Sequence, residues 1–188
     1  MKTDSGKLLI VAMVGAGVLA AGASWWFRFS ATHRAAQFWG NEAASLIRDA
    51  SNAEVLSLQL ADDAAAEGHI EVAGAAWQIT DSQDVSRAPG LTHLRHALLE
   101  DRSFRWPAQD VPVGATWSHG LRFRSGPNPP LTILFASDYT LMTRLPAGDG
   151  AAQAVICAPI AAGLEEVFRD WTQPVTRPAD SPATDGDR

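Results

Sequence analysis

Hydrophobic and polar positions divide the chain into one uninterrupted apolar segment, a long mixed region and a polar carboxyl terminus. The apolar segment, Leu8–Phe27, carries no charged side chain and is bounded by Lys7 and Arg28. A helix of about 20 mostly apolar residues can cross the hydrocarbon core of a bilayer, and aromatic residues such as those at the end of this segment favour the membrane interface. The pattern predicts a single-pass transmembrane anchor at residues 8–27, in contact with membrane lipid, after a tail at residues 1–7.

The same segment has three other interpretations. Ala12, Ala16 and Ala20 have the small-x-x-x-small spacing of a helix-pairing face, although alanine and glycine are simply common in spanning helices. A basic start, an apolar middle and the A-x-A sequence Ala21–Ala23 match a secretory signal peptide cleaved after Ala23. Cleavage would leave an aromatic cluster at the new amino terminus, so the pattern favours the uncleaved anchor. Gly15–Ala20 also matches the G-x-G-x-x-A fingerprint of dinucleotide-binding folds. That motif requires a following strand that ends in an acidic residue about 20 positions on, and no such strand is recognisable in the sequence.

Residues 31–50 are predicted to form an amphipathic helix. Apolar residues recur there at three- and four-residue steps, which places them on one face; they are Ala35, Phe38, Trp39, Ala43, Leu46 and Ile47. Gly40 is a weak point of this helix, because glycine inside a helix costs about 1 kcal/mol relative to alanine. Further helices are predicted at residues 87–101 and from Pro159 to Trp171.

Shorter apolar runs bounded by turn residues predict strands. These runs are Glu54–Leu60, His69–Ala73, Ala76–Thr80, Trp117–Arg124, Leu131–Ala136, Thr140–Leu145 and, as a short additional strand, Ala154–Cys157. Residues 61–68, 81–86 and 103–112 are expected to be turns, loops and connections. The element order α-β-β-α-β-β-β-α predicts an α+β domain at residues 31–172, with a mainly antiparallel sheet and about three helices. A similar order occurs in roadblock- or profilin-like domains. Residues 173–188 have almost no side chains to bury and are predicted to be disordered.

Composition narrows the function classes. The formal net charge is -6, so the chain lacks the basic footprint of a nucleic-acid-binding domain. A single cysteine, Cys157, excludes an internal disulfide and a zinc cluster built on several thiolates. Because Cys157 lies in an apolar run, we interpret it as a small buried hydrophobic residue.

The candidate metal ligands are His93, His96 and Glu100. Their spacing of three and four residues places all three on one face of the predicted helix at residues 87–101, and two imidazoles with a carboxylate can bind a transition metal. The spacing is not H-E-x-x-H, and a solvated polar face opposite the leucines explains the same residues.

Other reactive side chains form no recognisable catalytic set. His119 is predicted to lie on the apolar side of its strand, with backbone partners for its ring nitrogens. Ser118 and Ser137 are in no nucleophile motif. Four arginines, at positions 102, 105, 122 and 124, form either a basic patch or the solvent face of a strand and a loop. The sequence therefore assigns no catalytic or cofactor-binding residue and implies no cofactor.

Two stretches, Phe38–Ala50 (FWGNEAASLIRDA) and Gly90–Phe104 (GLTHLRHALLEDRSF), resemble parts of uncharacterised bacterial membrane-anchored proteins of unknown function. The resemblance implies a single-pass protein of the bacterial cytoplasmic membrane and carries over no catalytic residue. Basic residues are nearly balanced on the two sides of the span, so an extracytoplasmic domain is expected only by analogy with signal anchors.

These observations favour a membrane-anchored, non-enzymatic interaction or assembly module with an unidentified protein partner and no nucleic-acid partner. One alternative is a metal-binding or metal-dependent enzyme domain that uses His93, His96 and Glu100. Another is a carrier for lipid or a small ligand, with a pocket between sheet and helices.

Overall fold

The computed structural model describes residues 5–30, 33–61, 69–145 and 152–173. The expected turn at 61–68 and the expected disordered tail at 173–188 lie almost entirely outside the described residues. The expected amino-terminal tail is only partly separate, because helix α1 (Ser5–Ser30) already includes residues 5–7. Within α1, Leu9–Trp26 is long and apolar enough to cross a membrane, and none of it is buried against the rest of the chain.

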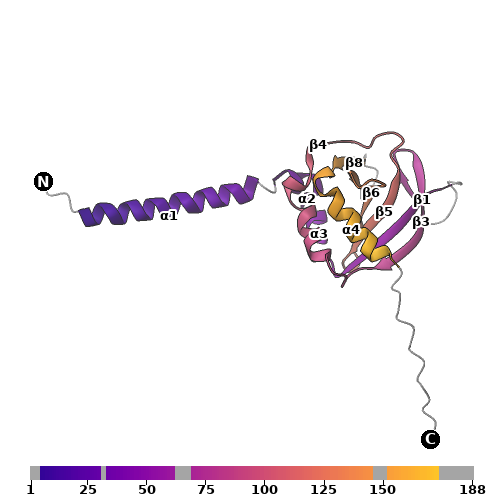
Figure 1. Ribbon diagram of the computed structural model, residues 1–188, viewed down its shortest axis with the longest axis horizontal. Helices are drawn as coiled ribbons and strands as arrows, with labels where there is room; N and C mark the ends of the chain where they lie inside the picture. The colour runs from indigo at the N-terminus through magenta and orange to yellow at the C-terminus, as the bar shows by residue number, and fades with distance from the viewer. Residues whose placement is uncertain (1–4, 31–32, 62–68, 146–151, 174–188) are drawn as a thin grey trace, which may run out of the picture.

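The folded part is built on one eight-stranded sheet in the order β2-β3-β1-β5-β6-β7-β8-β4. The strands are β1 (Asn52–Leu60), β2 (His69–Val72), β3 (Ala75–Asp84), β4 (Arg105–Asp110), β5 (Trp117–Arg124), β6 (Leu131–Ala136), β7 (Leu141–Arg144) and β8 (Gln153–Ile156). Every neighbouring pair is antiparallel, and the sheet is strongly curled (Figure 1). All six residues of β6 are buried, as its continuous apolar run predicts for a strand covered on both faces.

Helices cover one face of this sheet (Figure 1). They are α2 (His33–Asp49), α3 (Leu91–Leu98) and α4 (Ala161–Thr172), with the short 3-10 helices η1 (Asp101–Ser103) and η2 (Ala158–Ile160). All six residues of the apolar stripe predicted for residues 31–50 are buried in α2. They join the larger of two hydrophobic clusters, which also contains Leu121 and Phe123 of β5 and Phe168 of α4.

The other face of the sheet carries a second, smaller cluster to which no described helix contributes a residue. Its members come from five strands and are Leu56, Leu58, Ile70, Val72, Trp77, Trp117, Leu134 and Ala136. Neighbouring residues Val55 and Leu56 of β1 enter different clusters, because successive side chains of a strand point to opposite faces. The curled sheet therefore has an apolar interior on both faces.

The α+β class, the mainly antiparallel sheet and the amino-terminal apolar helix are confirmed, but the predicted order of elements is wrong. Three strands precede α3 and five follow it. The predicted loop at residues 81–86 is largely part of β3, which pairs with β1 as far as Asp84. The predicted connection at residues 103–112 contains β4, whose Trp106–Pro107 peptide bond is cis. The predicted helix at 87–101 is shorter, because α3 begins after Gly90, which has a φ of 86°.

Candidate binding site

An apolar cavity of about 270 Å³ lies beside the second hydrophobic cluster. Strands β1, β2, β3 and β5 and the loop between β4 and β5 line it, and its walls include Leu60, Val72, Trp77, Val111, Ala115 and Trp117. Pockets for small molecules are typically concave and mostly apolar. The cavity therefore has the character of a site for a small apolar group.

Two irregularities of strand pairing help to form this cavity. The pairing of β1 with β3 shifts between Ser57 and Leu58, and the pairing of β5 with β6 shifts between Trp117 and His119. An extra residue in one strand changes which face the following side chains occupy. Trp117 consequently belongs to the second cluster, whereas simple alternation would place it on the same face as Leu121.

The β4–β5 loop, residues 111–116, forms the rim of the cavity. Gly114 has a φ of 81°, a conformation that glycine adopts without steric cost. Val113 at the tip of this loop is 97% exposed, and Leu60 on the cavity wall is 63% exposed. Among the described residues outside α1, these are the only exposed large hydrophobic side chains. An apolar rim of this kind is available to a ligand or a partner.

Trp77 also has an unusual hydrogen-bonding state. Its Nε1 is buried and has no hydrogen-bond partner among the described residues. Other tryptophans of the folded part do have acceptors: Trp39 donates to the Leu98 carbonyl at 2.6 Å and Trp171 to the Pro89 carbonyl at 3.0 Å. A buried donor without an acceptor costs about 1–3 kcal/mol. Trp77 is also one of the residues that line the cavity, so this donor belongs to a cavity-lining side chain.

A second hollow, of about 460 Å³, lies on the other side of the same loop. It is more polar, and its walls include Thr116, Ser137 and Asp138. Hydrogen bonds from the Thr140 backbone and side chain lower the pKa of Asp138, so its carboxylate is ionised at neutral pH. The β4–β5 loop thus separates an apolar cavity from a polar one.

His119 lies under α4, on the face of the sheet that the helices cover. Its ring stacks on Tyr139 and contacts Phe168, with centroid separations of 5.6 and 5.3 Å. The predicted backbone partners are wrong: Nδ1 lies 2.9 Å from both the Ser118 and Tyr139 hydroxyl oxygens. Burial lowers the pKa of His119, so its imidazole is neutral at pH 7.

Cys157 lies next to this group and has the buried, unreactive character expected from its sequence context. It is completely buried, and its thiol donates to the Tyr139 carbonyl at 3.1 Å. Burial raises the pKa of Cys157 to about 12. Because the thiolate is the reactive form, this arrangement disfavours a nucleophilic or redox role in the folded protein.

The structure does not gather the three candidate metal ligands. Helix α3 ends at Leu98. Glu100 therefore lies beyond the helix that would place it on the same face as His93 and His96. The Glu100 carboxylate instead forms an ion pair with the Arg102 guanidinium at 2.5 Å. Within the described ranges, no three His, Cys, Asp or Glu side chains lie together as a metal site. The metal site stays a prediction without geometric support.

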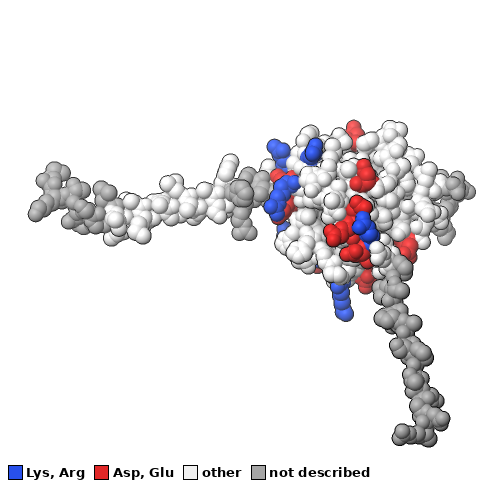
Figure 2. All heavy atoms as spheres, viewed as in Figure 1, with Lys and Arg blue, Asp and Glu red and all other residues white. Residues whose placement is uncertain are grey.

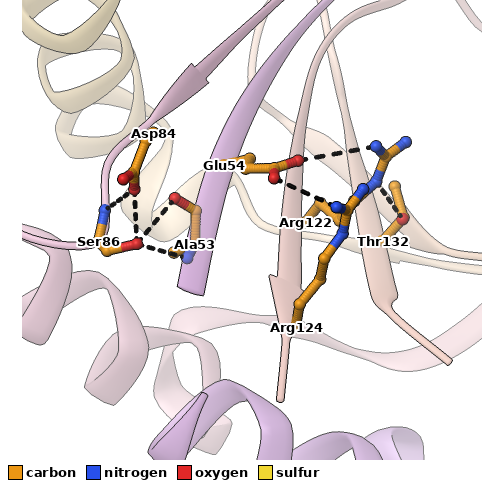
Figure 3. Close-up of polar contacts among 7 residues, drawn as sticks. All are labelled: Ala53, Glu54, Asp84, Ser86, Arg122, Arg124 and Thr132. Atoms are coloured by element: carbon orange, nitrogen blue, oxygen red, sulfur yellow. Dashed lines mark hydrogen bonds and ion pairs between the residues drawn. The ribbon is translucent and has the colours of Figure 1, made fainter. Parts of the chain in front are cut away.

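The four arginines considered as one patch are divided between two parts of the fold. Arg122 and Arg124 both approach the Glu54 carboxylate on the sheet, with N–O distances of 3.7 and 3.5 Å (Figure 3). Arg102 and Arg105 instead belong to η1 and β4.

The same view shows Ser86 joining Asp84 to Ala53, which fixes the end of β3 to the start of β1 (Figure 3).

Comparison with protein-family models, with curated proteins and with solved structures gives no match. The resemblance of Phe38–Ala50 and Gly90–Phe104 to bacterial membrane-anchored proteins therefore stays a prediction.

The cavity was not predicted from the sequence, although Trp77 and Trp117 were placed in strands. Its rim depends on β4 and on two pairing irregularities, and neither leaves a periodic signal in the sequence.

Proposed function

We propose that the protein is a membrane-anchored, non-enzymatic binding module, with α1 in the bilayer and the cavity side of the folded part facing its partner. The observation that carries this proposal is the exposure of α1: Leu9–Trp26 contains no charged residue, has a mean hydropathy of 1.8 and is entirely unburied. Soluble proteins rarely expose a contiguous apolar surface larger than a few hundred Å². A helix of this composition is stable without a protein cover when lipid surrounds it.

We also propose the finer placement argued from the sequence: a single span in the bacterial cytoplasmic membrane, with the folded part outside the cytoplasm. A roadblock- or profilin-like relationship remains a proposal of the same kind. The cleaved signal peptide is the competing account of α1, and it makes a different prediction. It requires a mature chain that begins at Ser24 and is released from the membrane.

Fractionation of cells that express the full chain tests the anchor. We expect the intact chain, beginning before Leu8, in the membrane pellet after washes with high salt and alkaline carbonate. Detergent should release it. Recovery of an uncleaved chain in the soluble fraction, or of a soluble chain that begins at Ser24, would overturn the proposal.

The binding role is supported by the exposed rim of the cavity. A photo-reactive amino acid at Val113 should crosslink one defined partner in intact membranes. The same amino acid at Thr92, an exposed position of α3, is the matched control and should crosslink little. Val113→Asp places a charge on the rim and should reduce partner recovery without changing the amount of folded protein. Equal crosslinking from both positions would remove the support for a binding face at this loop.

A second candidate function is a carrier of a small apolar ligand, and the cavity with its unpaired Trp77 Nε1 favours it. Native mass spectrometry of the full chain in detergent should then show a copurified small molecule. Ala115→Leu, which fills the cavity, should remove this ligand. Ala162→Leu, at an exposed position of α4, should retain it. An unliganded wild-type chain, or a ligand that survives Ala115→Leu, would contradict the carrier.

A further inference from the structure

A groove of about 490 Å³ lies between the start of α2 and strand β4. Its walls combine aromatic and apolar surface with amide and guanidinium donors, and they are formed by Arg34, Gln37, Phe38, Trp106, Pro107 and Gln153. We propose that this groove, with the exposed arginines at its edge, binds the headgroups of anionic phospholipids in the membrane that α1 spans. The inference rests on the proposed membrane anchor and adds a second lipid contact to it.

Contacts across the groove hold its two walls in fixed positions. The Asp101 carboxylate accepts hydrogen bonds from the Arg34 and Ala35 backbone N–H groups at 3.1 and 2.7 Å. The Trp106 Nε1 donates to the Asp101 carbonyl at 3.0 Å, and the Trp106 ring lies 6.0 Å from that of Phe38. The groove is therefore largely formed before any ligand binds, which reduces the entropy lost on binding.

The length of the connecting chain allows this groove to reach the membrane surface. Residues 27–30 continue α1 and add about 6 Å at the helical rise. The four steps from Ser30 to Arg34 add at most about 14 Å. The backbone of Arg34 therefore lies at most about 20 Å from the end of the apolar segment. Headgroups occupy about 5–8 Å on each side of the hydrocarbon core, and the surface potential extends a further Debye length of about 8 Å at physiological salt.

The charge distribution is complementary to an anionic surface. Figure 2 shows arginine side chains, with a few carboxylates among them, gathered at the edge of the folded part where α2 begins, whereas carboxylates predominate over α4. Arg34, Arg102 and Arg105 are all exposed. Two carboxylates share this edge: Asp101 accepts the α2 backbone hydrogen bonds, and Glu100 pairs with Arg102. An exposed pair such as Arg102–Glu100 is weak, so a phosphate group competes effectively for the guanidinium.

The aromatic walls suit the same location. Tryptophan side chains favour the membrane interface, where an apolar ring and a polar edge are both accommodated. Trp106 is half-buried and Pro107 is exposed, so both contribute apolar surface at the mouth of the groove. Strand β4 is also the last strand of the sheet, and among the described residues it pairs only with β8, so its outer backbone edge is unpaired within that part of the chain.

Hydrogen exchange of the full chain in lipid nanodiscs tests the proposal. The backbone amides of residues 105, 106 and 108–110 should exchange at least fivefold more slowly in phosphatidylglycerol discs than in phosphatidylcholine discs, and 0.5 M salt should remove the difference. Each arginine near an anionic surface changes the docking equilibrium about fivefold. The triple variant Arg34→Gln, Arg102→Gln, Arg105→Gln should therefore exchange equally in both lipids, while β6 keeps its protection as a measure of intact folding.

The control is a second triple variant with the same change in net charge: Arg48→Gln, Arg87→Gln, Arg169→Gln. These exposed arginines lie at the other end of α2, after β3 and on α4, and their removal should leave the lipid-dependent difference in place. The lipid-binding role of the groove would be overturned if the wild-type chain exchanged equally in the two lipids. It would also be overturned if both triple variants lost the lipid-dependent difference in exchange to the same extent. Size-exclusion chromatography separately measures whether the chain incorporates into the discs. A chain that does not incorporate would contradict the proposed membrane anchor, and this inference with it.

Discussion

Gly40 provides a direct test of the structure, because sequence and structure predict opposite signs for its replacement by alanine. A glycine inside a regular helix costs about 1 kcal/mol relative to alanine, so the sequence predicts that Gly40→Ala stabilises α2. In the structure Gly40 interrupts the helix, with a φ of 70° and a ψ of 168°. Only glycine readily adopts this region, and other residues there cost about 1–3 kcal/mol.

The expected loss comes from the backbone alone. Apart from the two chain neighbours and the backbone of the same helix, a Cβ atom added at Gly40 would meet no atom of the described residues within 4 Å, so overlap with packed side chains is not the source of the loss. We expect Gly40→Ala to lower the free energy of unfolding by about 1–3 kcal/mol. In a folded part of this size, such a loss lowers the Tm by roughly 2–4 °C for each kcal/mol.

Gly163 is the matched control within the same chain. It lies inside α4, and an added Cβ there also meets nothing within 4 Å. Gly163→Ala should therefore raise the free energy of unfolding by about 0.5–1 kcal/mol. Guanidinium unfolding of the full chain in detergent, followed by near-ultraviolet circular dichroism, measures both values. A stabilising Gly40→Ala, similar in size to Gly163→Ala, would show that α2 is continuous at residue 40 and would refute the reasoning.

Three other predictions concern single side chains. Asp101→Ala removes both hydrogen bonds to the start of α2 and should lower the free energy of unfolding by about 1–3 kcal/mol. The control Asp170→Ala, at an exposed site on α4, should change the free energy of unfolding by less than about 0.5 kcal/mol. Similar losses in the two variants would contradict a capping role of Asp101 at the start of α2. Burial lowers the pKa of His119 from 6.5, so the unfolded chain takes up the proton first. Stability should therefore fall as pH drops through 6.5 towards the lower pKa of the folded state. His119→Phe should flatten this part of the stability–pH curve, and an unchanged slope would exclude His119 as its origin. The pKa of Cys157 is raised to about 12, so iodoacetamide should modify this thiol only in unfolded molecules. The rate of labelling should therefore rise with denaturant concentration. Rapid labelling of the native chain at pH 8 would contradict this prediction.

The sequence predicted the burial of side chains best where that burial depends on a single helix face or a single strand. The stripe from Ala35 to Ile47 was predicted residue by residue, and all of its members are buried. The continuous apolar run Leu131–Ala136 was predicted as a central strand and has neighbours on both sides. Local periodicity was sufficient in these cases, because the contacts of each side chain follow from its position within its own element.

Elements that depend on a distant partner were predicted poorly. Strand β4 contains Pro107 and shows little alternation, so its strand conformation depends on pairing with β8. The metal hypothesis required a helix as far as Glu100, but α3 ends two residues earlier. Simple alternation places Trp117 on the same face as Leu121, but the irregular pairing of β5 with β6, which is a property of two strands together, places it on the other face.

The sequence by itself determined that one segment is apolar enough for lipid, that an acidic α+β domain follows it, and which face of α2 is buried. Each of these depends on side-chain chemistry repeated at a local period. The tertiary structure alone decided the sign of the effect expected at Gly40, the cavity beside Trp77 and Trp117, and the groove beside Arg34. Those features arise where residues far apart in sequence meet, such as Arg34 and Asp101, and only the folded backbone determines which of them lie within a few ångströms.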